Sequence, residues 1–490
     1  MADEVKVGGM NIGTKEIIFA IITLAIALSG WFIPAPEPMT EIGMRCLTVF
    51  VAMVVGWTLS AGAWPSLMGL LLFPATGVFT FSEFLGTGWG SDTLFFMIAA
   101  FVLVGYLKES GISQWMVNWL MTRKFLEGHP WRLVTMILVA AYIICSLVNF
   151  LVGLFLMWEI VYGITRNIGQ KPYDKFPSLM VFGIAMQCAF SLVTFPWSMN
   201  AIANLGVYAT VTGEAANMLR YMLFMIPFGA LEIAAYVLLC KFVFRLDVGP
   251  LKGVTMDMLN PEDSILTPDR KRAGLLLILF IIMLLLPSFF PAESAFRQFY
   301  GRFGTTGIIV LFFVIACLIY TKDGRKVVDF AKLAATNVPW NMVLMVAVIL
   351  AIGACLRSEL TGIAPFLAQN IVPIMTSVPG IAAIIVFLCV ETVLTNFLIN
   401  MVVVAMFLPV FMPAAAGLGT SPELLAFLIM LTSTNAILTP AGCAAAAMLF
   451  PNKEWMRTSD IYKYGVPTVI VNIVVLFVWF LICNMTGIWA

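Results

Sequence analysis

The chain has 490 residues, of which 61% are hydrophobic and 11% are charged, and its net charge is +1 at pH 7. Soluble domains carry about 25% charged residues, so this composition predicts an integral membrane protein. The near-zero charge and the single histidine argue against nucleic acid as a partner, and the nine cysteines, which show no CxxC or Cys/His spacing, argue against a zinc or disulfide framework.

Runs of about 20 apolar residues predict membrane-spanning helices. The first run, 17–33, follows Lys6 and Lys15 and has no small-residue cleavage site, so we expect a retained helix rather than a signal peptide. The whole pattern predicts an all-α polytopic membrane protein with about 11 transmembrane helices and two re-entrant hairpins. The predicted spans are 16–34, 46–60, 63–78, 92–107, 178–210, 218–245, 273–290, 303–320, 338–356, 422–450 and 465–487.

The distribution of lysine and arginine predicts the orientation in the membrane. If the N-terminus is cytoplasmic, most of the 27 basic residues fall on the cytoplasmic side. We therefore expect a protein of a bacterial-type cytoplasmic (inner) membrane, with its N-terminus in the cytoplasm and its C-terminus outside. The basic clusters that support this topology are 108–132, 166–175, 241–272, 322–332 and 453–463.

Region 133–165 is expected to enter the membrane and return on the same side. Arg132 and Arg166 flank it, and both belong on the cytoplasmic side. The region is too short for two full spans of about 20 residues each and a turn. A re-entrant hairpin of two half-helices fits, with its tip near 146–150. Non-helical backbone at that depth survives only where it is buried in protein or lines an aqueous cavity.

The second half of the sequence repeats the order of the first. Hairpin 133–165 corresponds to an outer hairpin at 379–416, aligned on Asn149 and Asn396, and each is followed by a helix broken in its middle. An odd number of spans in each copy turns the second one upside down, which is typical of a secondary transporter with a midplane site. The predicted parts are an N-terminal helix (1–40), repeat 1 (41–245, with broken helix 178–210), a cytoplasmic connector (246–272) and repeat 2 (273–490, with broken helix 422–450).

The hairpin tips are expected to form half of a binding site each. Asn149 and Asn396 would cap the second half-helix of their hairpins, because asparagine oxygen accepts a free backbone N–H. Helix N-termini carry partial positive charge, so two of them meeting at the midplane attract an anion without arginine. The half-helices that end near Leu147 and Leu394 expose carbonyls that suit a coupling cation.

The order of elements and the tip asparagines resemble the divalent anion/sodium symporter (DASS) family of carboxylate permeases, over nearly the whole chain. That family has Ser-Asn-Thr at each tip and a Thr-Pro-Pro-Asn-like loop in each broken helix. Here the tips read Val-Asn-Phe at 148–150 and Thr-Asn-Phe at 395–397, and the loops read Trp-Ser-Met-Asn at 197–200 and Thr-Ser-Thr-Asn at 432–435. The resemblance implies an elevator-type homodimer that moves an organic anion with sodium, and the lost hydroxyls favour an aromatic or larger acid.

The tips and breaks supply the candidate residues for binding substrate or ion. The one metal ion expected is sodium, at Asn149 and Asn396. Each has a simpler alternative: an asparagine can be only a cap, a hydroxyl can bond to its own helix, and a tryptophan can simply pack. The candidates are Asn149, Asn396, Thr395, Ser146, Asn200, Asn435, Trp197, Ser198, Thr194, Thr432, Thr434 and Thr439.

Glu391, Glu159 and Glu232 are the carboxylates well inside apolar runs, and they are candidates for proton coupling. A charge at the membrane centre costs roughly 2.5–3.5 kcal/mol on insertion scales, so such residues tend to be functional. Glu391 is the best candidate because it stands five residues before the outer tip. Glu159 and Glu232 have the alternative of lying near helix ends that face water.

These patterns favour secondary active import of an organic carboxylate coupled to sodium, with no cofactor. A proton-coupled transporter, an anion exchanger or an antiporter is the alternative. An intramembrane enzyme is disfavoured because the sequence has no HExxH, Ser/Lys or paired-aspartate motif. A passive channel fits less well than alternating access, because the two predicted hairpins open from opposite sides.

Overall fold

The computed structural model describes residues 4–7, 10–60, 62–253, 265–290, 294–321, 324–371, 373, 377 and 379–489. The described chain is mostly helical, in agreement with the predicted fold class. A short antiparallel hairpin of β1 (Glu4–Val7) and β2 (Met10–Gly13), which was not predicted, precedes the first helix. Part of the predicted connector 246–272 and part of the segment before the outer hairpin lie outside the described residues.

Several described helices are long and apolar enough to cross a membrane, which agrees with a polytopic membrane protein. They are α2 (Glu41–Leu59), α7 (Pro130–Leu147), α11 (Met218–Leu238) with the π-helical turn Leu239–Val243, α16 (Trp340–Arg357) and α23 (Thr458–Thr486). Two bent pairs pass the same test when each is taken as one span: α4 (Phe81–Trp89) with α5 (Asp92–Glu109), bent by 45°, and α13 (Ala295–Gly301) with α14 (Gly304–Leu318), bent by 85°.

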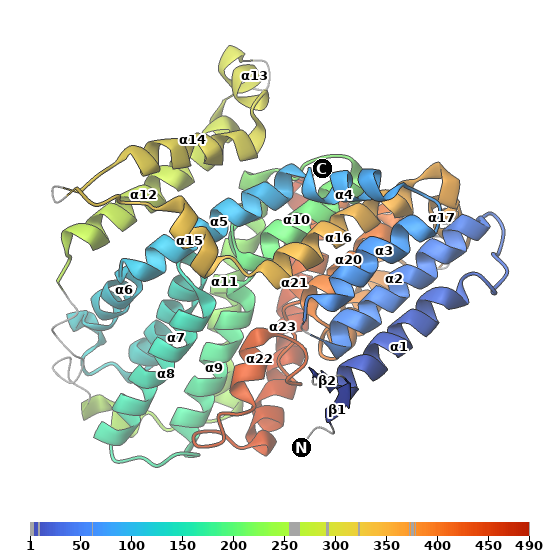
Figure 1. Cartoon of the computed structure of the whole chain (residues 1–490). Helices are drawn as coiled ribbons and strands as arrows, with labels where there is room; N and C mark the ends of the chain where they lie inside the picture. The colour runs from blue at the N-terminus through green and yellow to red at the C-terminus, as the bar shows by residue number, and fades with distance from the viewer. Residues whose placement is uncertain are drawn as a thin grey trace.

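The first half also contains α1 (Thr14–Ser29), α3 (Trp64–Ala75) and α6 (Ile112–Met121). Helices α1 and α2 lie side by side at one edge of the molecule (Figure 1). Thr40 caps α2 by accepting a hydrogen bond from the Gly43 N–H, and its hydroxyl donates to the Leu360 carbonyl at 2.6 Å. The start of α2 is therefore tied to the second half of the chain.

The chain reverses within region 133–165, at the position where the sequence predicts a tip. Helix α7 ends at Leu147 and α8 (Phe150–Asn167) begins after Asn149, whose Oδ1 accepts from the N–H groups of Leu151 and Val152 at 3.0 and 3.1 Å. Both helices have 18 residues, so they are longer than the predicted half-helices. They are longer because each helix continues beyond the apolar region to include its flanking arginine, Arg132 in α7 and Arg166 in α8.

The broken helices also occur where the polar residues interrupt the apolar runs. In the first half, α9 (Lys175–Ser191) and α10 (Met199–Thr212) are separated by 192–198. In the second half, α21 (Pro422–Thr432) and the short α22 (Ala444–Leu449) are separated by 433–443. Helices α7, α8 and α9 pack together in the lower part of the view in Figure 1.

The second half repeats this order of elements. After α12 (Pro268–Leu285), α14 and α15 (Phe330–Asn337) come α16, the short α17 (Ile363–Phe366), the hairpin α19 (Gly380–Thr395) and α20 (Asn400–Phe411), the broken pair α21 and α22, and α23. The same series in the first half is α5, α6, α7 with α8, α9 with α10, and α11. The label N lies near the bottom of the view in Figure 1 and the label C near its top.

Helix α16 approaches α4 closely because a glycine faces it. A Cβ atom placed on Gly88 would overlap the backbone carbonyl of Ala347 on α16, whereas one on Gly86, in the same helix, would meet nothing within 4 Å. The first turns of α16 border the central cavity described below. The contact at Gly88 therefore helps to position one wall of that cavity.

Replacing Gly88 with alanine is expected to destabilise the protein by about 1–3 kcal/mol, because the added methyl group must displace backbone rather than a flexible side chain. Gly86→Ala on the same helix is the matched control, and it should be neutral or slightly stabilising because alanine favours a helix over glycine. Thermal unfolding of the purified proteins measures both. Equal melting temperatures for the two variants would contradict the close approach.

Candidate functional site

A cavity of about 440 Å³, called the central cavity here, lies where the two hairpins and the two broken helices meet. Its wall includes the first residues of the described helices α8, α10 and α20, namely Phe150, Met199 and Asn400. The opposite wall comes from α2, α3 and α16. Among the described residues that line it, none is charged. Helix ends are therefore the groups that can supply partial positive charge to this cavity.

The three helix starts differ in how their backbone N–H groups are used. Asn149 accepts from two N–H groups of α8, and the Leu192 carbonyl accepts from Asn200 and Ala201 at the start of α10, at 3.0 and 3.2 Å. Helix α20 differs, because its cap residue Ile399 has no side-chain acceptor for the first N–H groups of the helix. The described chain shows no partner for the N–H groups of Asn400 and Met401. Orphan N–H groups at a helix start are the ones that bind anions, so α20 offers the strongest anion-binding end.

Asn400 places an amide at the same end of α20. Its side chain is 2% exposed, and its Nδ2 has no hydrogen-bond partner within the described part of the chain. Its Oδ1 accepts a long bond of 3.4 Å from the Thr395 hydroxyl. An unpaired buried amide costs about 1–3 kcal/mol, so this group is suited to donating to a ligand in the cavity. The sequence analysis did not single out Asn400, although a polar residue before an apolar run signals it.

A second cavity of about 310 Å³, the inner cavity, adjoins the central one at the tip of the first hairpin. Four predicted residues line it, namely Ser146, Asn149, Trp197 and Ser198, while Asn200 lines the central cavity. It extends to Lys108, which is exposed at the end of α5. The residues that the two cavities share are Phe150, Leu192, Met199 and Pro339.

The predicted role of Asn396 as the N-cap of the second half-helix is wrong. Asn396 follows the last residue of α19 and lies four residues before α20 begins, because the outer tip is longer than the inner one. Its Nδ2 donates to the carbonyls of Thr392 and Asn435 at 2.7 and 3.1 Å, and its Oδ1 accepts from the Leu438 N–H at 2.7 Å. It therefore fastens the outer tip to the break between α21 and α22.

Other polar residues extend this connection. The Thr395 hydroxyl donates to the Ser433 carbonyl at 2.6 Å, and the Thr439 hydroxyl donates to the Asn396 carbonyl. Asn435 accepts on its Oδ1 from Asn472 of α23 at 3.5 Å. Asn472 was missed by the sequence analysis, although an asparagine inside a 29-residue apolar helix marks it. The carbonyl and side-chain oxygens gathered here are the ligand type that a hard cation prefers.

The remaining candidates have mainly structural contacts. The hydroxyls of Thr194, Thr432 and Thr434 donate to the backbone carbonyls of Phe190, Leu428 and Leu431, at 3.1, 2.7 and 2.6 Å. The Thr194 hydroxyl also lies 3.0 Å from the hydroxyl of Tyr142 on α7. Trp197 lines the inner cavity, but its ring also stacks on Phe195, with ring centroids 4.7 Å apart. These hydrogen bonds agree with the alternative that the threonine hydroxyls bond to nearby backbone carbonyls.

The three intramembrane glutamates lie in different surroundings. Glu391 is fully buried on α19, and neither of its carboxylate oxygens has a hydrogen-bond partner in the described chain. Glu232 is fully buried on α11 and accepts a hydrogen bond from the Gln187 amide of α9. Glu159 lies exposed on α8 and lines neither the central nor the inner cavity. Glu391 and Glu232 are equally buried, but Glu391 has no hydrogen-bond partner among the described residues and is the closest of the three in sequence to a hairpin tip.

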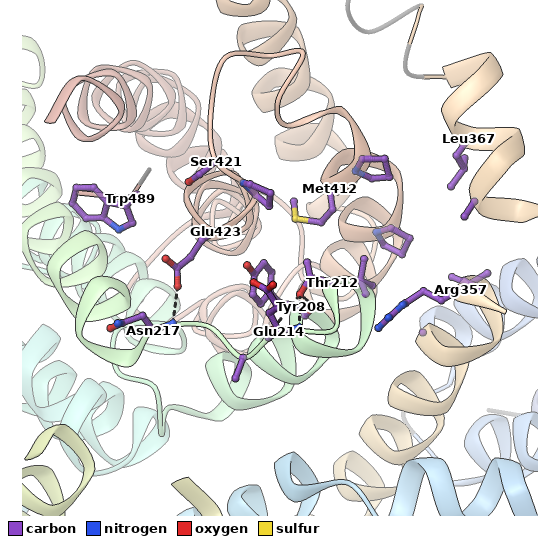
Figure 2. A pocket seen from close by; sticks show the side chains of 18 of the residues that line it. Tyr208, Thr212, Glu214, Asn217, Arg357, Leu367, Met412, Ser421, Glu423 and Trp489 are labelled. Atoms are coloured by element: carbon purple, nitrogen blue, oxygen red, sulfur yellow. Dashed lines mark hydrogen bonds between the residues drawn. The ribbon is translucent and has the colours of Figure 1, made fainter. Parts of the chain in front are cut away.

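A larger pocket of about 610 Å³, the outer pocket, lies between the end of α10 and the starts of α11 and α21, with α16 and α17 at its side. Glu423 pairs with Arg220 at 3.1 Å and accepts from the Asn217 N–H at 2.6 Å. Figure 2 shows Arg357 reaching from α16 toward α10, where its guanidinium donates to the Thr210 carbonyl. The sequence analysis did not predict this pocket.

Known proteins similar to this chain are transporters. Solute carrier family 13 member 1 of Homo sapiens is 26% identical over 239 residues, which are 45% of this chain and 39% of that protein. The putative malate transporter YflS of Bacillus subtilis is 26% identical over 128 residues, 26% of either chain. The matched segments thus span less than half the length of both relatives.

Two solved transporters have the same fold over nearly the whole chain. The YdaH transporter of Alcanivorax borkumensis superimposes with a TM-score of 0.59 at 13% identity and covers 97% of this chain and 99% of its own. MtrF of Neisseria gonorrhoeae, described as illuminating a class of antimetabolite efflux pumps, gives a TM-score of 0.60 at 13% identity, with 95% and 94% covered. At this identity the likeness shows the fold alone.

The resemblance to carboxylate permeases is confirmed by a family match over most of the chain. Residues 49–432 match the citrate transporter family. That family consists of transporters rather than enzymes. The match extends from α2 to the end of α21 and so includes both hairpins and the first broken helix. The chain therefore belongs to the citrate transporter family.

Proposed function

We propose that this protein is a secondary active transporter of an organic carboxylate, and that the carboxylate binds in the central cavity. The observation that carries the proposal is that α8, α10 and α20 all begin at the wall of a cavity whose described lining has no charged residue. Each helix start carries roughly +0.5 elementary charge, which suits an anion in a low-dielectric site. The names of the relatives, a solute carrier and a putative malate transporter, support the same substrate class.

The transport step is an elevator movement of the hairpins and broken helices past α2 and α16. The central cavity lies between these two groups of helices, as such a movement requires. The adjoining inner cavity reaches Lys108, within the basic cluster that the charge distribution assigns to the cytoplasm. In this arrangement the substrate site communicates with the cytoplasmic side of the membrane, and the N-terminus lies on that side.

On the opposite face, the contact between Arg357 and Thr210 joins the two groups of helices. Arg357 stands at the end of α16, and Thr210 belongs to the last turn of α10. A cation next to the carbonyls of a helix C-terminus is favourable both as a hydrogen-bond donor and because of the helix dipole. The contact thus holds the outer face closed while the cytoplasmic side is open.

Sodium is the coupling ion of this proposal, bound among the oxygen atoms around Asn396, Thr395 and Asn435. A proton carried by Glu391 is the second candidate, and the observation that favours it is the full burial of that side chain without a partner in the described chain. An ionised carboxylate in such surroundings pays a large desolvation cost. The expected homodimer, which the resemblance implies, belongs to the same proposal.

Asn396→Ala is expected to lower carboxylate uptake about 10- to 100-fold, because it frees the outer tip from the break between α21 and α22 and leaves buried groups unpaired. Asn149→Ala should act similarly by uncapping α8. Uptake of radiolabelled citrate and malate into proteoliposomes, with sodium and pH gradients imposed separately, measures this and identifies the coupling ion. Asn370→Ala, at an exposed asparagine, is the control. Unchanged uptake in both tip variants would place the site elsewhere.

Glu391→Gln separates the two coupling candidates. If Glu391 carries the proton, the glutamine variant should lose the dependence of uptake on an imposed pH gradient, because glutamine has the same shape but cannot release a proton. Uptake rates measured between about pH 5.5 and about pH 8, the range in which side chains with perturbed pKa values commonly titrate, test this. A pH profile equal to that of the unmodified protein would remove Glu391 from the coupling mechanism.

Arg357→Gln is expected to favour the state that is open to the outside, by several-fold, because a charged hydrogen bond on the closed face is lost. Cys443 is a native reporter, since it lines the central cavity and is partly exposed. Its alkylation by a membrane-impermeant maleimide from the cytoplasmic side, followed by mass spectrometry of its peptide, should slow in the variant. Arg45→Gln is the control, because the described contacts of Arg45 are with Glu41 of its own helix and with the ring of Trp31, away from the contact between α16 and α10. Unaltered alkylation would contradict the closing contact.

A further inference from the structure

The lining of the central cavity also indicates which carboxylates it accepts, an inference that rests on the proposed function. The charge available for binding comes from helix starts, because no described lining residue adds a cationic side chain. Helices α16 and α22 also begin at this cavity, beside α8, α10 and α20. A substrate with several carboxylates, such as citrate, therefore has no cationic side chain to pair with each of them.

Donors in the cavity are concentrated at the helix starts. The unpartnered Nδ2 of Asn400 lies there, and Asn200 lies at the start of α10. On the opposite side, Ser60 accepts from Trp64 at 3.1 Å and Ser66 accepts from Trp57 at 3.0 Å, and the hydroxyl hydrogens of both serines can still be donated. The lining between these two groups of donors is mostly apolar, so a substrate with polar groups around its whole surface would leave some of them unpaired, at a cost of about 1–3 kcal/mol each.

The rest of the lining is apolar and adaptable. Methionine fills irregular space and makes favourable contacts between its sulfur and aromatic rings, and aromatic side chains offer flat faces for stacking. Phe397 at the outer tip, in contrast, is 60% exposed and does not line the cavity. Of the two tip phenylalanines, Phe150 therefore supplies the apolar contact surface in the cavity. The residues of this apolar wall are Trp57, Phe150, Met199, Met342, Met345 and Met401.

We propose that the central cavity selects a mono- or dicarboxylate attached to a flat apolar body, such as a phenyl ring, in preference to citrate. The carboxylate lies at the starts of α8 and α20, where Asn400 donates its unused amide hydrogen. The ring lies against the apolar wall between Trp57 and the methionines of α16. Cavity volumes of about 300–1,000 Å³ with a few placed polar groups are typical of sites for ligands of this kind.

The test compares three acids that differ in body and charge: succinate, phenylsuccinate and citrate. In competition with a labelled carboxylate for uptake into proteoliposomes, phenylsuccinate should be at least about tenfold more potent than succinate or citrate, which corresponds to about 1.4 kcal/mol. Met345→Ser should reduce the ratio between the potencies of phenylsuccinate and succinate several-fold. Met485→Ser is the control, since Met485 is 86% exposed at the end of α23.

The outcomes separate this proposal from the proposed function. If citrate or succinate competes as well as phenylsuccinate, the preference for an apolar body is wrong while carboxylate transport stands. If Met345→Ser and Met485→Ser behave alike, the apolar wall does not contact the substrate. If none of the three acids is transported or competes, both the preference and the transport of carboxylates are overturned. Thermal unfolding of each variant verifies that the protein is folded.

Discussion

A helix that ends inside hydrocarbon must find partners for its unpaired backbone groups, and this constraint shapes the centre of the molecule. No water is present there to bind an orphan N–H or carbonyl, so each break must be buried against protein or open to a cavity. Two hairpins and two broken helices provide such ends, and the cavity where α8, α10 and α20 begin collects three of them. In the proposed function, these helix ends form the anion site without a basic side chain.

The two halves use asparagine differently to meet this constraint. In the first half, Asn149 satisfies two N–H groups of its own hairpin. In the second half, Asn396 bonds across to the break between α21 and α22, and α20 starts without a side-chain cap in the described chain. The second hairpin is thus both fastened to its neighbour and left with free donors. In the proposed function, the free donors of α20 bind the anion, and the oxygen atoms around Asn396 bind the coupling cation.

The sequence was sufficient to locate the helix breaks, but it did not show which groups pair with the unpaired backbone N–H and carbonyl groups at each break. Polar residues inside apolar runs marked both tips and both broken helices, because a buried polar group needs a purpose in lipid. The hydrogen bonds of Asn396 could not be predicted, since they depend on a tip that is longer than its counterpart and on a partner loop that is distant in the sequence. Trp57 and Met345 carried no motif at all, because they reach the cavity only through the packing of α2 and α16. Asn400 and Asn472 stood in the sequence as polar interruptions and were readable in principle.

The central claim is that a carboxylate lies at the starts of α8 and α20. A cryo-EM structure of the protein with a bound phenyl-substituted dicarboxylate tests it most directly. The account predicts carboxylate density within hydrogen-bonding distance of Nδ2 of Asn400 and of backbone N–H groups at these helix starts, with the ring on the side of Trp57. Density beside Arg357 in the outer pocket, with an empty central cavity, would contradict it.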